Sequence, residues 1–135
     1  MKRILTPISR EEARMKNPLV LAYIGDTVYD LYYRSLAIKS SESHVNKLNK
    51  EVSAKVNAKA QSCAVEYIIN ALSEDETEIF KRGRNAKSQT SPKNMLIGDY
   101  RRATGLEAVI GYLWLTGEYE RIDELMDIIT EEDNG

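Results

Sequence analysis

The distribution of proline constrains the fold of this 135-residue chain more than any other feature of its sequence. Only three prolines occur, at positions 7, 18 and 92, so long stretches can form uninterrupted helices. Asn17 and Pro18 are typical of an N-cap and a first turn, and they predict a helix that runs to about Ala37. A second long helix is predicted from His44 to Ala71, where apolar or alanine residues recur in steps of three and four, namely Val45, Leu48, Val52, Val56, Ala60, Ala64, Ile68 and Leu72.

Three further helices are predicted in the second half of the chain. Ser73 and Glu76 have the spacing of a capping box, which opens a short acidic helix ending near position 83. Residues 83–98 lack apolar periodicity and are predicted to form a basic loop. Asp99 is predicted to cap a helix that runs to about Thr116 and ends at Gly117, and a last amphipathic helix is expected over about 119–130. Since no convincing strand occurs, the fold class is predicted to be all-α, a compact bundle of five or six helices.

The length and composition indicate one domain over residues 1–135, with residues 1–15 as a loosely packed N-terminal segment. No apolar run approaches the ~20 residues of a membrane span, and the charged N-terminus does not resemble a secretion signal, so a cytoplasmic location is expected. One cysteine, Cys63, and one histidine, His44, exclude an internal disulfide and a Cys/His zinc cluster. A metal ion would be held by oxygen atoms, which favours magnesium or manganese.

The net charge of −2 results from two opposite patches. Residues 81–102 contain seven basic residues and one acid, Asp99, whereas residues 118–133 contain eight acids and one base, Arg121. The basic patch is compatible with a nucleic-acid partner, and the acidic patch is most simply a solvated surface.

Asp26 is the first charged residue after nine uncharged ones in the segment NPLVLAYIGDTVYDLYYR, residues 17–34. On a helical wheel Asp26 points away from the apolar stripe of this segment, which consists of Val20, Ile24, Val28 and Leu31. Gly25 stands beside it and has no side chain to keep another backbone or a ligand away. The sequence therefore predicts that this carboxylate either makes a buried hydrogen bond or binds a ligand.

Glu107 is the only charged residue in GLEAVIGYLWL, residues 105–115. A helix that is apolar on every side is a buried helix, and an ionised glutamate there is costly unless it is paired or bound to a metal. A salt bridge to Arg34 would satisfy Glu107, and a tyrosine hydroxyl would satisfy Asp26. The two isolated acids together favour a site for a hard cation such as magnesium, which takes one or two protein carboxylates.

The segments AYIGDTVYDLYYR, KRGRNAKS and TGLEAVIGYLWL occur in an order that resembles Mini-ribonuclease III, the compact bacterial branch of the ribonuclease III family. The resemblance extends from about Asn17 to Leu125. It implies the endonuclease-domain fold and a homodimeric, metal-dependent endoribonuclease that cleaves double-stranded RNA, with the large-subunit ribosomal RNA precursor as its substrate. It also implies that Asp26 and Glu107 are catalytic and bind Mg²⁺, or Mn²⁺.

The chain departs from full-length ribonuclease III enzymes, which carry further acids at the positions of Leu19, Ala22 and Thr104. The number of metal ions is therefore left open, and Asp30, one turn after Asp26, could assist. After position 117 only 18 residues remain, too few for the appended double-stranded-RNA-binding domain of those enzymes. Affinity for RNA is therefore expected to come from basic residues of the nuclease domain, namely Arg82, Arg84, Lys87, Lys93, Arg101 and Arg102.

Two other functions are compatible with the sequence. The missing acids would suit a non-catalytic helical module that binds RNA or the ribosome. An all-α magnesium-dependent nucleotide pyrophosphohydrolase would need paired acids one turn apart on an apolar background, but Glu74 and Glu78 have polar neighbours. Cleavage of double-stranded RNA and hydrolysis of nucleotides would distinguish these alternatives.

Overall fold

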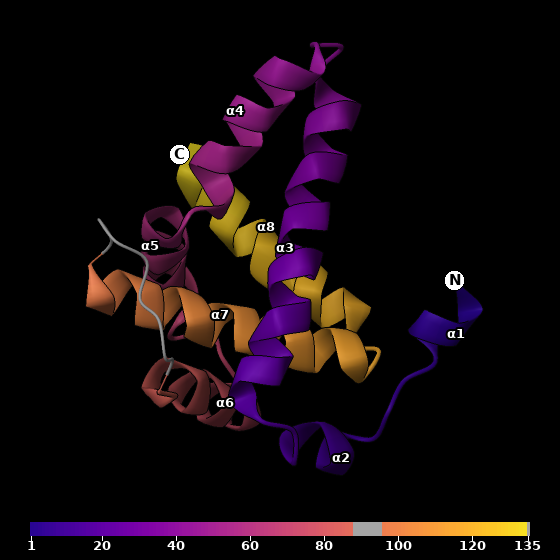
Figure 1. Ribbon diagram of the computed structural model, residues 1–135, viewed down its shortest axis with the longest axis vertical. Coiled ribbons are helices and arrows are strands. Elements are labelled where there is room, and N and C mark those ends of the chain that lie inside the picture. The colour runs from indigo at the N-terminus through magenta and orange to yellow at the C-terminus, as the bar shows by residue number, and fades with distance from the viewer. Residues whose placement is uncertain (88–95, 135) are drawn as a thin grey trace.

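The computed structural model of the protein describes residues 1–87 and 96–134, and within these ranges it is built from helices without any strand. This architecture confirms the predicted all-α fold class. Figure 1 shows the order of the helices, which are α1 (Lys2–Leu5), α2 (Arg10–Arg14), α3 (Pro18–Ser40), α4 (Val45–Val56), α5 (Ala58–Ile68), α6 (Glu74–Asn85), α7 (Ile97–Leu115) and α8 (Tyr119–Asn134).

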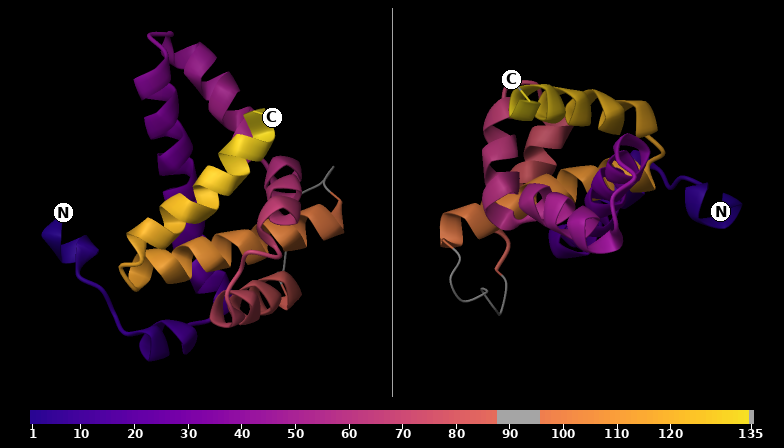
Figure 2. Two further views of the ribbon diagram at one scale, coloured as in Figure 1. Left: turned by 180° about the vertical axis from the view of Figure 1, so that it is seen from behind. Right: turned by 90° about the horizontal axis from the view of Figure 1, so that it is seen from above.

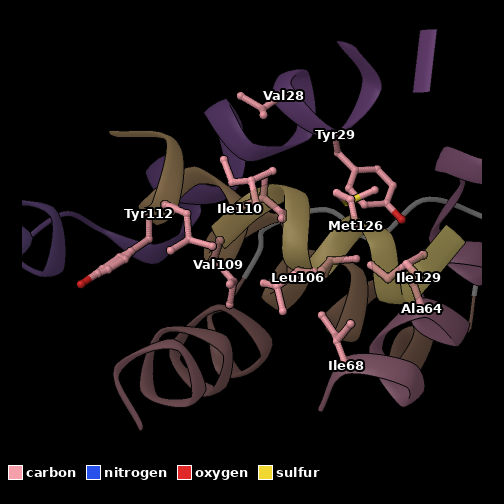
Figure 3. Close-up of a cluster of buried hydrophobic side chains, with 14 of the residues drawn as sticks. Val28, Tyr29, Ala64, Ile68, Leu106, Val109, Ile110, Tyr112, Met126 and Ile129 are labelled. Carbon is pink, nitrogen blue, oxygen red and sulfur yellow. The ribbon is translucent and has the colours of Figure 1, made fainter. Parts of the chain in front are cut away.

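Helix α7 forms the centre of the bundle. It packs against α3 and α6 most extensively, and also against α5 and α8 (Figures 1 and 2). Between Ala103 and Leu113 every residue of α7 is buried except Glu107. Figure 3 shows how apolar side chains of α3, α5 and α8 pack around those of α7, including Val28, Tyr29, Ala64, Ile68, Leu106, Val109, Ile110, Met126 and Ile129.

The local capping signals in the sequence are reproduced. Asn17 Oδ1 accepts a hydrogen bond from the backbone N–H of Leu19 at 2.8 Å, and α3 begins at Pro18. Both hydrogen bonds of the Ser73–Glu76 capping box are formed at the start of α6. Gly117 has a φ of +74° just after the end of α7, a backbone conformation that favours glycine.

The prediction of one helix from His44 to Ala71 is wrong. The helix is interrupted at Asn57, which has an extended backbone (ψ 162°) and separates α4 from α5. Its side chain accepts from the N–H of Ala60 at 2.9 Å and donates to the carbonyl oxygen of Ser53 at 2.9 Å. These bonds replace the helical hydrogen bonds that the backbone loses at the break, as asparagine side chains readily do.

Two other helix predictions also need correction. Helix α7 begins at Ile97, with Leu96 as its N-cap, so Asp99 does not cap it. Asp99 lies instead in the first turn, where a negative charge interacts favourably with the helix dipole. Helix α3 continues beyond Ala37 to Ser40, and the described residues contain more than the five or six helices predicted, because the N-terminal segment adds α1 and α2 and the long helix is split.

The apolar stripe predicted on α3 packs on the core only in part, through Val28 and the partly buried Ile24. Val20 and Leu31 are 51% and 54% exposed, and the buried face consists of Leu21, Ala22, Gly25, Val28, Tyr29 and Tyr33. Apolar spacing alone left both faces plausible, because this helix carries apolar or aromatic residues on most of its circumference.

Helix α1 contributes no residue to the core and stands apart from the bundle, as Figures 1 and 2 show, whereas α2 buries Ala13. Among the described residues, no helix combines the length and the hydropathy needed to cross a membrane.

Candidate active site

The crossing of α3 and α7 brings the two isolated acids together. A side chain at Gly25 would overlap the carbonyl oxygen of Glu107, and a side chain at Gly111 would overlap the carbonyl oxygen of Leu21. The two helices therefore touch backbone to backbone, which only glycine permits at these two positions. Asp26 follows Gly25 directly, so it lies beside Glu107 although 81 positions separate them in the sequence.

Asp26 and Glu107 line one open surface groove of about 460 Å³. The Asp26 side chain is exposed, whereas Glu107 is partly buried at the base of the helix crossing. The groove is walled by α3, the start of α5 and α7, and the other residues that line it are Leu19, Ala22, Tyr23, Val56, Ala58, Gln61, Tyr100, Ala103 and Thr104.

The pKa of the Glu107 carboxyl is raised to about 9, because burial disfavours its charged form. The hydrogen bond with Asp26 and the negative charge of Asp26 raise this pKa further, whereas the side chain of Gln61 lowers it. The carboxyl groups of Asp26 and Glu107 are thus within hydrogen-bonding reach of each other. Without a cation, the pair avoids two adjacent negative charges by keeping Glu107 protonated at neutral pH.

The donor set suits a magnesium ion better than a metal held entirely by protein. Among the described residues, no three His, Cys, Asp or Glu side chains cluster as a metal site. Leu19, Ala22 and Thr104 all line the groove, and none of them supplies a carboxylate. Two carboxylates in an open groove leave room for the waters and substrate oxygens that complete the coordination of Mg²⁺.

Asp30 lies outside the groove, although it is one turn after Asp26. Its Oδ2 pairs with Nε of Arg34 at 2.8 Å. A purely structural explanation of Glu107 would require Arg34 to pair with Glu107. Arg34 pairs with Asp30 instead. The paired acids Glu74 and Glu78, which a pyrophosphohydrolase would need, are exposed near the start of α6, outside this groove.

Three of the predicted RNA-binding residues meet in a second groove of about 330 Å³, namely Arg84, Arg101 and Arg102. The Arg84 guanidinium lies 5.8 Å from the centre of the Phe80 ring, and Arg102 Nη1 pairs with Glu66 at 2.7 Å. Arg101 is exposed at the surface of this groove. Arg101 and Arg102 lie near the N-terminus of α7, the helix that carries Glu107, and Arg84 adds a positive charge from α6.

The other predicted RNA-binding residues lie apart from this groove. Lys87 is exposed after the end of α6, and Lys93 lies outside the described residues. Arg82 is used within the fold, because its guanidinium donates to the carbonyl oxygens of Arg14 at 2.7 Å and Lys16 at 3.1 Å. These bonds connect α6 to the end of α2 and to the segment that follows it.

Sequence reasoning missed Gln61, which lines the Asp26–Glu107 groove and is only 2% exposed. The signal for it was weak, because a single glutamine in a helix rich in alanine also suits a surface position. Its burial depends on the break at Asn57, which starts α5 and which the apolar periodicity did not reveal.

Comparisons with known proteins show which family this chain resembles. Residues 19–118 match the model of the Ribonuclease III domain family. A Mini-ribonuclease 3 from Clostridium tetani is 49% identical over 122 residues, which cover 90% of this chain and 81% of the relative. A Mini-ribonuclease 3 from Staphylococcus aureus is 41% identical, with 86% and 88% covered.

A crystal structure of a protein from Fusobacterium nucleatum superimposes with a TM-score of 0.81 at 37% sequence identity, covering 89% of this chain and 96% of that one. The family match, over residues 19–118, includes every residue that lines the Asp26–Glu107 groove. These matches confirm the resemblance inferred from the sequence motifs. The chain therefore belongs to the ribonuclease III family and is an endoribonuclease, a hydrolase of phosphodiester bonds in RNA.

Proposed function

We propose that the Asp26–Glu107 groove binds a divalent cation, Mg²⁺ or Mn²⁺, and that the protein uses it to cleave double-stranded RNA. The observation that carries this proposal is the pair of carboxyl groups, which two helices hold within hydrogen-bonding reach in an open groove. A bound divalent cation supplies Lewis-acid stabilisation of the negative charge that develops on the phosphate oxygens. The role of Asp26 and Glu107 is to hold that cation at the groove.

The basic residues support RNA as the substrate. Arg101 and Glu107 are six residues apart on α7, which is about 9 Å along the helix axis at ~1.5 Å per residue. Six residues also turn by about 240° around the helix axis, so the arginine groove and the Asp26–Glu107 groove, which share no lining residue, lie on different sides of α7. An RNA duplex that extends over both grooves would contact the arginines while its phosphates meet the carboxylates. Exposed Lys87 and the sequence-predicted Lys93 would add contacts, and binding would weaken steeply with salt concentration. Arg82 would contribute least, because its donors are bound to carbonyl oxygens.

A homodimer would cleave both strands of a duplex, one strand at each site. The unused apolar surface of α3 supports this assembly, because Val20, Leu31 and Ile38 are all more than half exposed. The large-subunit ribosomal RNA precursor, acted on in the cytoplasm, is the substrate that the resemblance to Mini-ribonuclease III suggests.

The test is cleavage of a double-stranded RNA in magnesium by the wild type and by Asp26→Asn, with mapping of the product ends. We expect the wild type to cut both strands and Asp26→Asn to bind the RNA without cutting it, because the variant removes a charged ligand and keeps the shape. Asp30→Asn is the matched control, since Asp30 lies on the same helix but outside the groove. Full activity of Asp26→Asn would refute the proposal, and so would binding without cleavage by the wild type.

A further inference from the structure

Gln61 places a buried amide in the wall of the Asp26–Glu107 groove. The residue lies in the first turn of α5, is 2% exposed, and lines the groove together with the two acids. Its Nε2 atom has no hydrogen-bond partner among the described residues. Leaving a buried donor without a partner costs free energy, so an unpaired donor at this place calls for an explanation.

The surroundings of Gln61 leave few acceptors for this donor. Leu19, Ala22, Val56, Ala58 and Ala103 give the nearby walls of the groove an apolar character. The polar side chains in the groove besides Gln61 are the hydroxyls of Tyr23, Tyr100 and Thr104 and the carboxyl groups of Asp26 and Glu107, and the Thr104 hydroxyl donates to the carbonyl oxygen of Tyr100 at 2.9 Å. Glu107 provides the strongest of these acceptors that is not exposed to solvent, because an ionised carboxylate accepts more strongly than a hydroxyl and Asp26 is exposed. The lowering of the Glu107 pKa by the side chain of Gln61 agrees with this placement.

The fold accounts for the position of this amide. Asn57 ends α4 and caps α5, so that α5 runs along α7 and presents Gln61 to the Glu107 region. A continuous helix through position 57 would not change direction at this point. The break that the apolar periodicity failed to predict is therefore the feature that delivers Gln61 to the groove.

We propose that Gln61 is a positioning residue, whose amide N–H holds one oxygen of the Glu107 carboxylate so that the other oxygen faces the divalent cation. This inference rests on the proposed function of the groove. Partners that hold metal ligands from outside commonly set the orientation of those ligands. Such support matters more here, because Leu19, Ala22 and Thr104 stand where full-length ribonuclease III enzymes have further acids.

The test compares wild type with Gln61→Met, which keeps the length of the side chain and removes both polar atoms. Binding of Mn²⁺ to the full chain without RNA is followed by electron paramagnetic resonance, and thermal unfolding is measured without metal. We expect Mn²⁺ affinity to fall about 10- to 100-fold. We expect the melting temperature to stay the same or rise, because the variant removes an unpaired buried amide. Cys63→Ser, an exposed position two residues along the same helix, is expected to change neither quantity.

The inference is overturned if Gln61→Met binds Mn²⁺ as the wild type does, or if its affinity loss accompanies a large fall in melting temperature. If Gln61→Met does not fold, Gln61→Leu is measured in the same way, and failure of both variants to fold would assign Gln61 to packing. Absence of Mn²⁺ binding by the wild type, or unchanged binding by Asp26→Asn, would refute the cation site itself. If the wild type binds Mn²⁺ and Gln61→Met binds it equally well, only the proposed role of Gln61 is refuted.

Discussion

Glu107 is the residue at which burial and charge conflict most strongly. It interrupts the buried run from Ala103 to Leu113, and its pKa is raised to about 9 by burial and by the adjacent Asp26. In the unfolded chain the same carboxyl returns to its ordinary value of 4.5. Between these two pH values the folded state therefore binds more protons at this position than the unfolded state does.

This difference predicts a pH dependence of stability in the protein without metal. The contribution of Glu107 is fully present below pH 4.5 and is lost as the pH rises towards 9, so the free energy of unfolding should fall across this range. Glu107→Gln should lose this part of the dependence, because glutamine does not titrate. Urea denaturation at a series of pH values, in the presence of a chelator, measures the slope of the unfolding free energy against pH for the wild type and for Glu107→Gln.

Glu78→Gln provides a comparison, because it removes an exposed carboxyl from α6 and should keep the wild-type slope. Equal slopes for the wild type and Glu107→Gln would mean that burial does not perturb Glu107. Adding Mg²⁺ should reduce the fall at high pH, because the ion binds the ionised carboxylate and therefore stabilises the folded state.

At the scale of helices, the contact between α3 and α7 determines the site. The backbones approach each other at Gly25 and Gly111, and this contact sets which face of α3 is buried and where Asp26 lies. Two glycines in an otherwise bulky interface thus set the geometry of the proposed site, although neither has a side chain that could bind a ligand.

Gly25→Ala should destabilise the protein by about 1–3 kcal/mol or more, because the new methyl group would overlap the Glu107 backbone and force the helices apart. Gly98→Ala is the control within α7, since no atom lies within 4 Å of the position of its added Cβ. That variant should keep or raise stability, by up to about 1 kcal/mol, because alanine is the better helix former. Urea midpoints measure both effects, and equal midpoints would mean that α3 and α7 are not in close contact.

At the scale of the whole molecule, helix α3 carries apolar residues that do not pack within one copy of the chain. Helix α3 buries one face against α7 and leaves Val20 and Leu31 in water. Exposed apolar side chains on one helix are compatible with a protein interface, and they support the homodimer proposed above.

Leu31→Glu should convert the dimer to a monomer, because burying a new charge at the interface is costly. The molar mass from light scattering after size-exclusion chromatography measures the change. Val45→Glu, at an exposed apolar position on α4, should leave the dimer intact. A monomeric wild type would contradict the proposal, and a dimeric Leu31→Glu variant would place the interface elsewhere.

Much of this protein could be predicted from its sequence, because the responsible interactions are local. The helix starts at Asn17 and Ser73 and the stop at Gly117 depend on bonds between residues a few positions apart. Asp26 and Glu107 were recognisable because each is the lone charge in a long apolar segment. The resemblance to the ribonuclease III family rests on the same short segments.

Other features followed only from contacts between distant residues. The buried face of α3 depends on Gly111 of α7, and the structural role of Arg82 depends on the carbonyl groups of Arg14 and Lys16. Gln61 was not identified, because its burial requires α5 to pack on α7 after the break at Asn57. The sequence by itself determined the helices and the two candidate acids through local hydrogen bonds and periodicity. Only the tertiary structure decided which faces meet, because that choice depends on how backbones and side chains far apart in the chain fit against each other.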